Sequence, residues 1–267
     1  TYFETRPPSN TAEEAIRIAD AVANKVNESF KEFMEQTFLC GDGYSSFIKA
    51  GREIVSDRGI FVEKKKRYIL HIIDNEGERV DKMKIMGMDT KKTTMPKEVA
   101  NKLNKFIERL LKGESWNDIA ADIVAYKDEL RHPSNIMSIG LPKGIKNVEK
   151  YTDEFETNIK PRIPGHVMAA IFYNRCLKRY NDKEHTPITS GQKIKVFYLA
   201  HVYDNTFKSI ALPTDIETIP EWFYNFQIDY EAHIERLVDN PLEGILDAIK
   251  ERIPAKHELT INNFFEF

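Results

Sequence analysis

The spacing of apolar residues changes along the chain, and this change constrains the fold more than any other feature. From about residue 60 the apolar period is two, which is typical of strands. Between residues 11 and 40 it is close to four, which predicts one long amphipathic helix. The residues that set this longer period are Ile18, Val22, Val26, Phe30 and Met34. Together the two periods predict an α+β protein.

The expected helix has clear ends. Thr11 is followed by Glu14, a capping-box pattern, and the apolar period stops near Cys40. Thr1 to Thr5 alternates as the end of a strand does, and residues 7–10 (Pro-Pro-Ser-Asn) then break the chain. Residues 41–43 (Gly-Asp-Gly) are interpreted only as a turn.

A β-hairpin is expected next. Residues 67–73 form an apolar strand pattern, and residues 82–86 form the returning strand. The turn between them is Asn75-Glu76-Gly77.

A second, mostly helical region with a small β insert is expected from Pro96, a residue that favours a helix start. The first helix should stop at Lys112-Gly113, and Ser115 should cap the next. The further expected elements are a helix from about His166 to Tyr180, a β-pair at 193–203 and 209–212, and helices at 230–238 and 242–250.

Composition excludes some classes of protein. Hydrophobic residues make up 41% and charged residues 30% of 267 residues, as in an ordinary globular protein, and no apolar run is long enough to cross a bilayer. Cys40 and Cys176 are isolated, which fits a reducing cytoplasm. The net charge of −3 does not favour a nucleic-acid binder, but positive charge is clustered. The clusters lie at 64–67, 82–84, 91–92, 143–150 and 175–179.

Standard enzyme motifs are absent from the sequence. It has no P-loop, no glycine-rich dinucleotide motif and no nucleophile elbow. Its seven histidines show no metal-ligand spacing and are interpreted as surface or hydrogen-bonding residues.

Residues 63–68, Glu-Lys-Lys-Lys-Arg-Tyr, are the informative segment. A lysine run alone is usually a solvated face. This run, however, leads directly into an apolar strand, and alternation would place Lys66 and Tyr68 on one face and Arg67 on the other. A cation and a phenol side by side suit a duplex groove, where the lysine donates to phosphates or base acceptors.

The same segment resembles the KKRY block of family B DNA polymerases, most closely those of T-even-type phages. The matching blocks are Lys65 to Tyr68, Asp74 to Gly77 and Lys84 to Lys97. Weaker similarity continues in register, from about Glu53 to Phe267, through residues 164–175, 191–196 and 229–243.

The resemblance implies a partial palm at 1–95, a thumb at 96–258 and a sliding-clamp peptide at 259–267. In the palm hairpin it implies that Lys65, Lys66, Arg67 and Tyr68 contact the minor groove of new duplex. Lys91, Lys92 and Thr93 are expected at the primer backbone. The residues expected to line the thumb are Asn147, Lys150, Tyr151, Arg162 and His166.

The last residues include Phe264, Phe265 and Phe267. They are either a frayed tail or, as in the phage polymerases that end similarly, a peptide that docks into the sliding clamp. Clamp docking is favoured because exposed aromatic residues are effective anchors.

The aspartate motifs that hold the two catalytic metals in the family are absent from the chain. Mg²⁺ is therefore expected in the assembled polymerase, with its ligands in an N-terminal partner. Glu53 is either a peripheral neighbour of the metals or an exposed strand residue. The chain is expected to be inactive alone and to be the C-terminal subunit of a split enzyme or a fragment of a longer one, with a split favoured because the C-terminal end looks complete.

Primer–template DNA and the clamp are the other expected partners, no membrane is expected, and the expected location is the cytoplasm of an infected bacterium. Two alternatives stay open. One is a non-catalytic module that binds duplex DNA or tethers the clamp, and the other is an α+β domain whose basic clusters are merely solvated.

Overall fold

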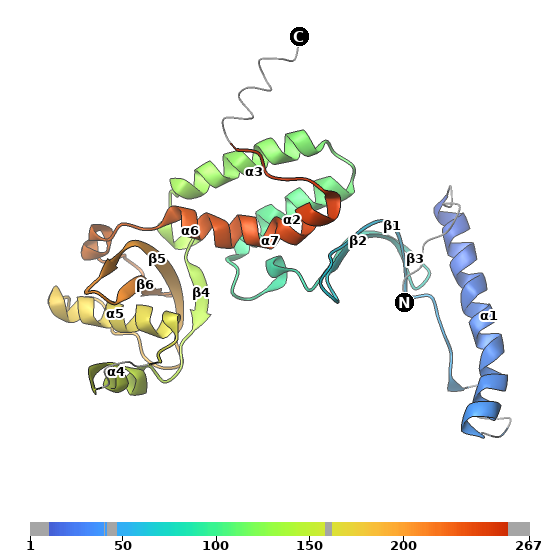
Figure 1. Ribbon diagram of the computed structural model, residues 1–267, viewed down its shortest axis with the longest axis horizontal. Helices are drawn as coiled ribbons and strands as arrows, with labels where there is room; N and C mark the ends of the chain where they lie inside the picture. The colour runs from blue at the N-terminus through green and yellow to red at the C-terminus, as the bar shows by residue number, and fades with distance from the viewer. Residues whose placement is uncertain (1–10, 40, 42–46, 158–161, 256–267) are drawn as a thin grey trace, which may run out of the picture. The chain divides into compact units, whose positions relative to one another are not determined.

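A computed structural model describes residues 11–39, 41, 47–157 and 162–255 of the chain (Figure 1). The chain divides into two compact units, with the division between Met86 and Gly87. Both units combine helices with a three-stranded antiparallel sheet, so the predicted α+β class is confirmed.

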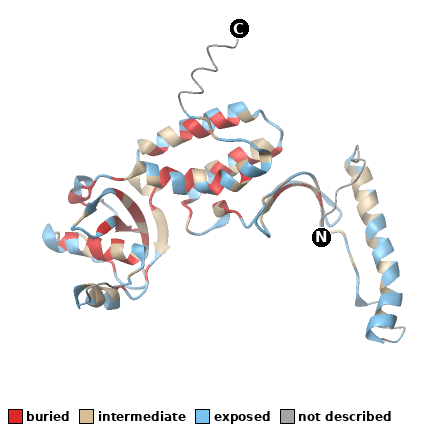
Figure 2. Cartoon of the chain, viewed as in Figure 1, coloured by how far each residue is buried: buried red, intermediate tan, exposed pale blue. Residues whose placement is uncertain are grey.

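The first unit begins with the predicted long helix, α1 (Ala12–Phe38). The Thr11 hydroxyl caps it by accepting a hydrogen bond from the Glu14 N–H at 3.1 Å. Leu39 ends it in the left-handed conformation, with φ of 53°. Helix α1 has no buried residue, as Figure 2 shows, and Val22 and Val26 of its apolar stripe remain more than one-third exposed.

Three strands follow, β1 (Ile54–Phe61), β2 (Tyr68–Asn75) and β3 (Glu78–Met86), paired in the order β1-β2-β3. Glu76 and Gly77 both have positive φ, as the two central residues of a type I′ turn require, so the predicted hairpin turn is confirmed. Strand β1 begins before residue 60, where the period of two becomes visible in the sequence, because bulges near Ser56 interrupt that period.

The predicted placement of Lys66 and Tyr68 on one face of a strand is wrong. Lys66 lies in the turn between β1 and β2, not in a strand, and its φ is 63°. Hydrogen bonds from the Val62 N–H to the Arg67 carbonyl, at 3.2 Å, and from the Arg67 N–H to the Lys64 carbonyl, at 3.3 Å, close this turn. Alternation along a strand therefore does not relate Lys66 to Tyr68.

A buried ion pair ties this unit together. The Arg52 guanidinium donates to Asp74, which is 2% exposed at the end of β2, and to Asp20 of α1 at 2.7 Å. Asp74 also accepts the Gly77 N–H of the turn at 3.0 Å. Burial opposes the ionisation of Asp74, but the hydrogen bonds from Arg52 and Gly77 outweigh it and lower the pKa of Asp74.

The second unit contains a layer of helices. α2 (Lys97–Leu111) and α3 (Trp116–Arg131) follow Pro96 and Ser115 as predicted, although the Ser115 side chain makes no cap hydrogen bond. Gly113, with φ of 82°, ends the first of them. Leu103 and Ile119 are almost fully buried within this layer. The remaining short helical segments are η2 (Asp89–Lys91), η3 (Ile136–Ser138) and η4 (Glu221–Asn225).

A second sheet, with β4 (Leu141–Gly144), β5 (Lys193–Tyr203) and β6 (Phe207–Pro213), has the order β4-β5-β6. Helix α5 (Gly165–Arg179), predicted at almost these bounds, packs on β6 (Figure 1). Stacking of Phe172 on Phe207, with ring centroids 4.4 Å apart, forms the centre of an aromatic core.

The sequence did not predict β4 or the helix α4 (Val148–Thr157). β4 has four residues and contains Pro142, so it reads as a turn. The apolar residues of α4, Val148, Tyr151 and Phe155, recur at steps of three and four, but they are few among many charged residues.

The chain's last described helices are continuous. α6 (Tyr230–Ile234) runs into a π-helical segment, η5 (Glu235–Asp239), and then into α7 (Asn240–Ile249). Ile234 and Asn240 both keep right-handed helical angles, so the predicted gap between two helices is wrong. Pro241 favoured that gap because proline interrupts helical hydrogen bonding, but the π turn directly before it keeps the rod intact.

His233 connects this rod to the second sheet. It is 1% exposed, and its Nε2 accepts the Tyr198 N–H at 2.9 Å. Burial lowers the pKa of His233 to about 4, so the ring is neutral near pH 7. His233 thus matches the predicted role of a hydrogen-bonding histidine.

We expect replacement of Asp74 by Ala to destabilise the first unit by about 3 kcal/mol, because it leaves the buried Arg52 charge with only the half-exposed Asp20 as a partner. Asp20→Ala removes the half-exposed partner of the same arginine and should cost less than about 1 kcal/mol. Amide hydrogen exchange in β2 measures both effects. Both tryptophans, Trp116 and Trp222, lie in the second unit, so tryptophan fluorescence during urea unfolding should stay unchanged. Equal losses for the two variants would contradict the role of the buried pair.

Candidate nucleic-acid interface

A cationic turn lies at one end of the first sheet. Lys64, Lys65 and Lys66 are exposed, and Arg67 is half-buried where β2 is about to begin. These residues carry four positive charges against the single negative charge of Glu63. Within the described residues neither Lys65 nor Lys66 forms an ion pair, so both ammonium groups are available to an anionic ligand.

Tyr68 is the first residue of β2 and stands beside this turn. It pairs across the strands with Phe61, and the two ring centroids are 6.1 Å apart. Tyr68 is half-buried, and Phe61 is 54% exposed. The sheet therefore presents an aromatic surface next to the four cations. Phe61 was not among the site residues predicted from the sequence.

His71 joins all three strands of this sheet. Its Nδ1 lies 2.6 Å from Asp57 of β1, and its Nε2 lies 2.8 Å from Asp81 of β3. Hydrogen bonds to Asp81 and Asp57 outweigh partial burial and raise the pKa of His71. The protonated ring donates to both carboxylates, whereas a neutral ring can donate to only one of them.

Glu53 precedes β1, and its carboxylate is 69% exposed. It pairs with Lys84 of β3 at 3.0 Å, so its nearest charged neighbour is a cation of the chain itself. No group of three carboxylate, histidine or cysteine side chains suited to a metal ion occurs among the described residues. The role of Glu53 near metals stays a prediction.

Lys91, Lys92 and Thr93 are exposed in the second unit, around the end of η2. Lys92 pairs with Asp89 at 2.5 Å, and its N–H bonds the Asp89 carbonyl at 3.0 Å. Thr90, between them in the chain, is buried and anchors the segment. Lys91 is thus the more available cation of the two.

Asn147, Lys150 and Tyr151 lie at the start of α4. Asn147 has φ of 55°, and its carbonyl accepts the Tyr151 N–H at 3.1 Å, so it reverses the chain into the helix. The next N–H, that of Val148, donates to the Ser190 hydroxyl at 3.0 Å. Asn147 and Lys150 are exposed as a result.

Arg162 is exposed, and His166 lies half-buried in the first turn of α5. Burial and the positive charge of Lys143 on β4 lower the pKa of His166. Lys143 is therefore a neighbour of His166 that the predicted thumb residues did not include, although it belongs to the basic cluster at 143–150.

The predicted clamp residues Phe264, Phe265 and Phe267 lie outside the described residues. The expected N-terminal strand at Thr1 to Thr5 lies outside them too.

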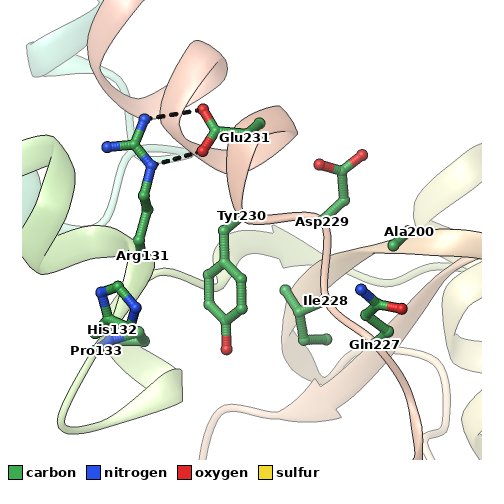
Figure 3. Close-up of a pocket in the computed structure, with 9 residues that line it drawn as sticks. All are labelled: Arg131, His132, Pro133, Ala200, Gln227, Ile228, Asp229, Tyr230 and Glu231. Atoms are coloured by element: carbon green, nitrogen blue, oxygen red, sulfur yellow. Dashed lines mark hydrogen bonds and ion pairs between the residues drawn. The ribbon is translucent and has the colours of Figure 1, made fainter. Parts of the chain in front are cut away.

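An open pocket of about 710 Å³ lies between the end of α3 and residues 227–231 (Figure 3). Arg131 and Glu231 form a two-point ion pair at its edge, with distances of 2.6 and 3.1 Å. Asp229 accepts the Ala232 N–H at 2.9 Å and caps α6. These charges already have structural partners, and none of the predicted DNA contacts lines the pocket.

None of the described helices combines the length and the apolar character that crossing a membrane requires.

Comparison with known proteins points to one class of enzyme. The chain is 30% identical over 213 residues to the DNA-directed DNA polymerase of Escherichia phage RB69, a match that covers 78% of this chain and 23% of that protein. It is 27% identical over 199 residues to the DNA-directed DNA polymerase of Enterobacteria phage T4, covering 71% of this chain and 21% of that protein. The chain thus spans less than a quarter of these relatives. No family model matches it.

The raised pKa of His71 predicts a pH dependence of stability. The group stabilises the fold fully below its unfolded pKa of 6.5 and loses this contribution as the pH rises through its higher folded pKa. We expect the first unit to unfold at lower urea concentration at about pH 9 than at about pH 6, measured by far-UV circular dichroism. His71→Gln should flatten this dependence, and His201→Gln, at an exposed histidine of the second unit, should not. An unchanged slope in His71→Gln would show that the two aspartates do not hold a charged ring.

Proposed function

We propose that this chain, which is related to a part of the family B DNA polymerases of T-even-type phages, holds primer–template duplex for such an enzyme. The observation that carries the proposal is the cationic turn at 64–67, exposed at the end of a sheet and adjoined by Tyr68.

The turn suits a phosphate backbone for an electrostatic reason. A lysine that neutralises a phosphate releases a condensed counterion, which favours binding in a salt-dependent way. Lys65 and Lys66 are exposed and extend from a turn closed by backbone hydrogen bonds, so their Cα positions are fixed. We infer that they contact the duplex at the minor groove, with Arg67 and Tyr68 beside them.

The second unit supplies further contacts in this proposal. Lys91, Lys92 and Thr93 are exposed and would follow the primer backbone. A second group, near the starts of α4 and α5, would act as the thumb surface. Its members are Asn147, Lys150, Tyr151, Arg162 and His166, with Lys143 added by its position next to His166.

The catalysis of nucleotide addition would be carried out by another part of the polymerase. This sequence lacks the aspartate motifs of polymerase active sites, and its described residues contain no cluster of three or more histidine, cysteine or carboxylate side chains. We infer that Mg²⁺ and its ligands belong to an N-terminal part, either a separate subunit or a continuation of the same chain. The tail with Phe264, Phe265 and Phe267 would link the assembled enzyme to its sliding clamp.

Binding of duplex DNA by the chain alone tests whether the cationic turn contacts DNA. We expect Lys65→Ala and Lys66→Ala each to lower the slope of log affinity against log salt by about 0.9, because each removes one phosphate contact. Fluorescence anisotropy of a labelled primer–template at several salt concentrations measures this slope.

Lys31→Ala is the matched control, because Lys31 is an exposed lysine of the same unit that lies on α1, where it pairs with Glu35. Its slope should equal that of the original chain. If all three variants give the same slope, the cationic turn is not part of the DNA interface.

Primer extension tests the assembly. Mixed with the N-terminal part of a T-even-type polymerase and Mg²⁺, the chain should support extension, whereas neither component should do so alone. Removal of residues 263–267 should abolish stimulation by the clamp and leave basal extension unchanged.

Two other outcomes have definite meanings. Duplex binding without extension in the mixture would favour a non-catalytic DNA-binding module. The absence of both activities would mean that the basic clusters are only solvated surface.

A further inference from the structure

Three apolar side chains form a row across the end of the first sheet. Phe61 of β1 lies directly opposite Tyr68 of β2, and Tyr68 lies directly opposite Met86 of β3. Directly opposed residues of antiparallel strands point to the same face of the sheet. Phe61, Tyr68 and Met86 therefore form one continuous strip, the apolar rung.

The apolar rung is accessible. Phe61 is 54% and Met86 is 43% exposed, while Tyr68 between them is half-buried. Single exposed apolar residues are common on protein surfaces, but a contiguous group is informative about binding. The three side chains together make a surface that a ligand can cover.

Gly59 shapes the rung. A Cβ atom at this position would lie 2.6 Å from Cδ2 of Leu70 and 3.5 Å from Cε2 of Phe61. The absence of that atom leaves room for Leu70 beside the strand, and one edge of the Phe61 ring borders the same space. Phe61 as a whole remains 54% exposed.

The positive charge next to the apolar rung indicates what kind of ligand it binds. The rung adjoins the turn with Lys64, Lys65, Lys66 and Arg67, so a partner that covers it also meets several cations. A ligand with an apolar surface bordered by negative charge fits this arrangement. Duplex DNA offers both, because sugar atoms form the walls of its grooves and phosphates form the rims.

The size of the rung favours the minor groove. Two strand spacings of about 4.8 Å give it a length of about 10 Å, which matches about three base-pair steps of 3.4 Å. It is one side chain thick, which suits a groove about 6 Å wide and would leave the major groove, about 12 Å wide, largely empty.

We propose that the apolar rung packs lengthwise into the minor groove, against the deoxyribose walls, while Lys65 and Lys66 contact the phosphates at its rim. This inference rests on the proposed function and adds Phe61 and Met86 to the DNA-contacting residues. Their contacts to the sugars are the same for every nucleotide, whereas the amino group of guanine on the groove floor limits how deeply the rung can enter.

Measurements of affinity and of its salt dependence distinguish the contribution of the apolar rung to DNA binding from that of the lysines. Phe61→Ala and Met86→Ala should each weaken binding of the full chain to a primer–template about five- to tenfold at every salt concentration, because they remove apolar contact area. The slope against log salt should stay constant, since no charge is lost. Phe61→Leu keeps an apolar side chain and should bind nearly as tightly as the original chain.

The matched control is Phe33→Ala, at a phenylalanine of α1 that is 51% exposed, and it should leave affinity unchanged. Amide exchange in β2 shows whether each variant keeps the sheet. Replacing guanine by inosine removes an amino group from the minor groove, and 7-deazaguanine changes only the major groove. Inosine should alter the affinity of the original chain more than that of Phe61→Ala, and 7-deazaguanine should affect neither.

Different failures have different meanings. If Lys65→Ala and Lys66→Ala weaken binding while folded Phe61→Ala and Met86→Ala do not, the rung proposal is wrong and the proposed function stands. If only 7-deazaguanine affects the original chain, the rung does not lie in the minor groove. If the original chain does not bind duplex at all, both proposals fail.

Discussion

The ion pair between Arg52 and Asp74 is the interaction on which the first unit depends. It connects the segment before β1 to the end of β2, and Arg52 extends the connection to α1 through Asp20. Asp74 also fixes the turn at Gly77, which sets the register of β2 against β3. A slip by one residue would turn every side chain to the opposite face, so the surface at the far end of the sheet depends on this buried charge.

The sequence predicts the elements whose signals are local. Thr11, Pro96 and Gly113 mark helix ends through capping chemistry and backbone preference, and the structure places helix ends at all three. β4 could not be found in this way, because its stability comes from pairing with β5, and α4 has too few apolar residues among its charges to stand out from a loop. Lys66 could not be placed either, since a lysine with positive φ is uncommon and the closed turn around it imposes that conformation.

The candidate DNA contacts show a similar division. The lysines at 64–66 are visible in the sequence as a cluster, even though the net charge is −3. Phe61 and Met86 are 25 positions apart in the chain, and only the registers of two strand pairs bring them into one row with Tyr68. The proximity of Lys143 to His166 likewise depends on tertiary structure, which no spacing in the sequence encodes.

The π-helical segment at Glu235–Asp239 determines where the last rod tolerates the loss of a residue. A π turn holds one more residue than an α turn, so loss of one residue there would restore regular α-helix. One π turn completes nearly the same rotation as one α turn with one residue more, so this deletion would leave the faces of the residues beyond it almost unchanged. Leu242 and Ile245, which are buried on α7, would stay in the core. A deletion within α7 itself would instead rotate the rest of that helix by about 100° about its axis. The π segment is therefore the part of this rod that best tolerates the loss of one residue.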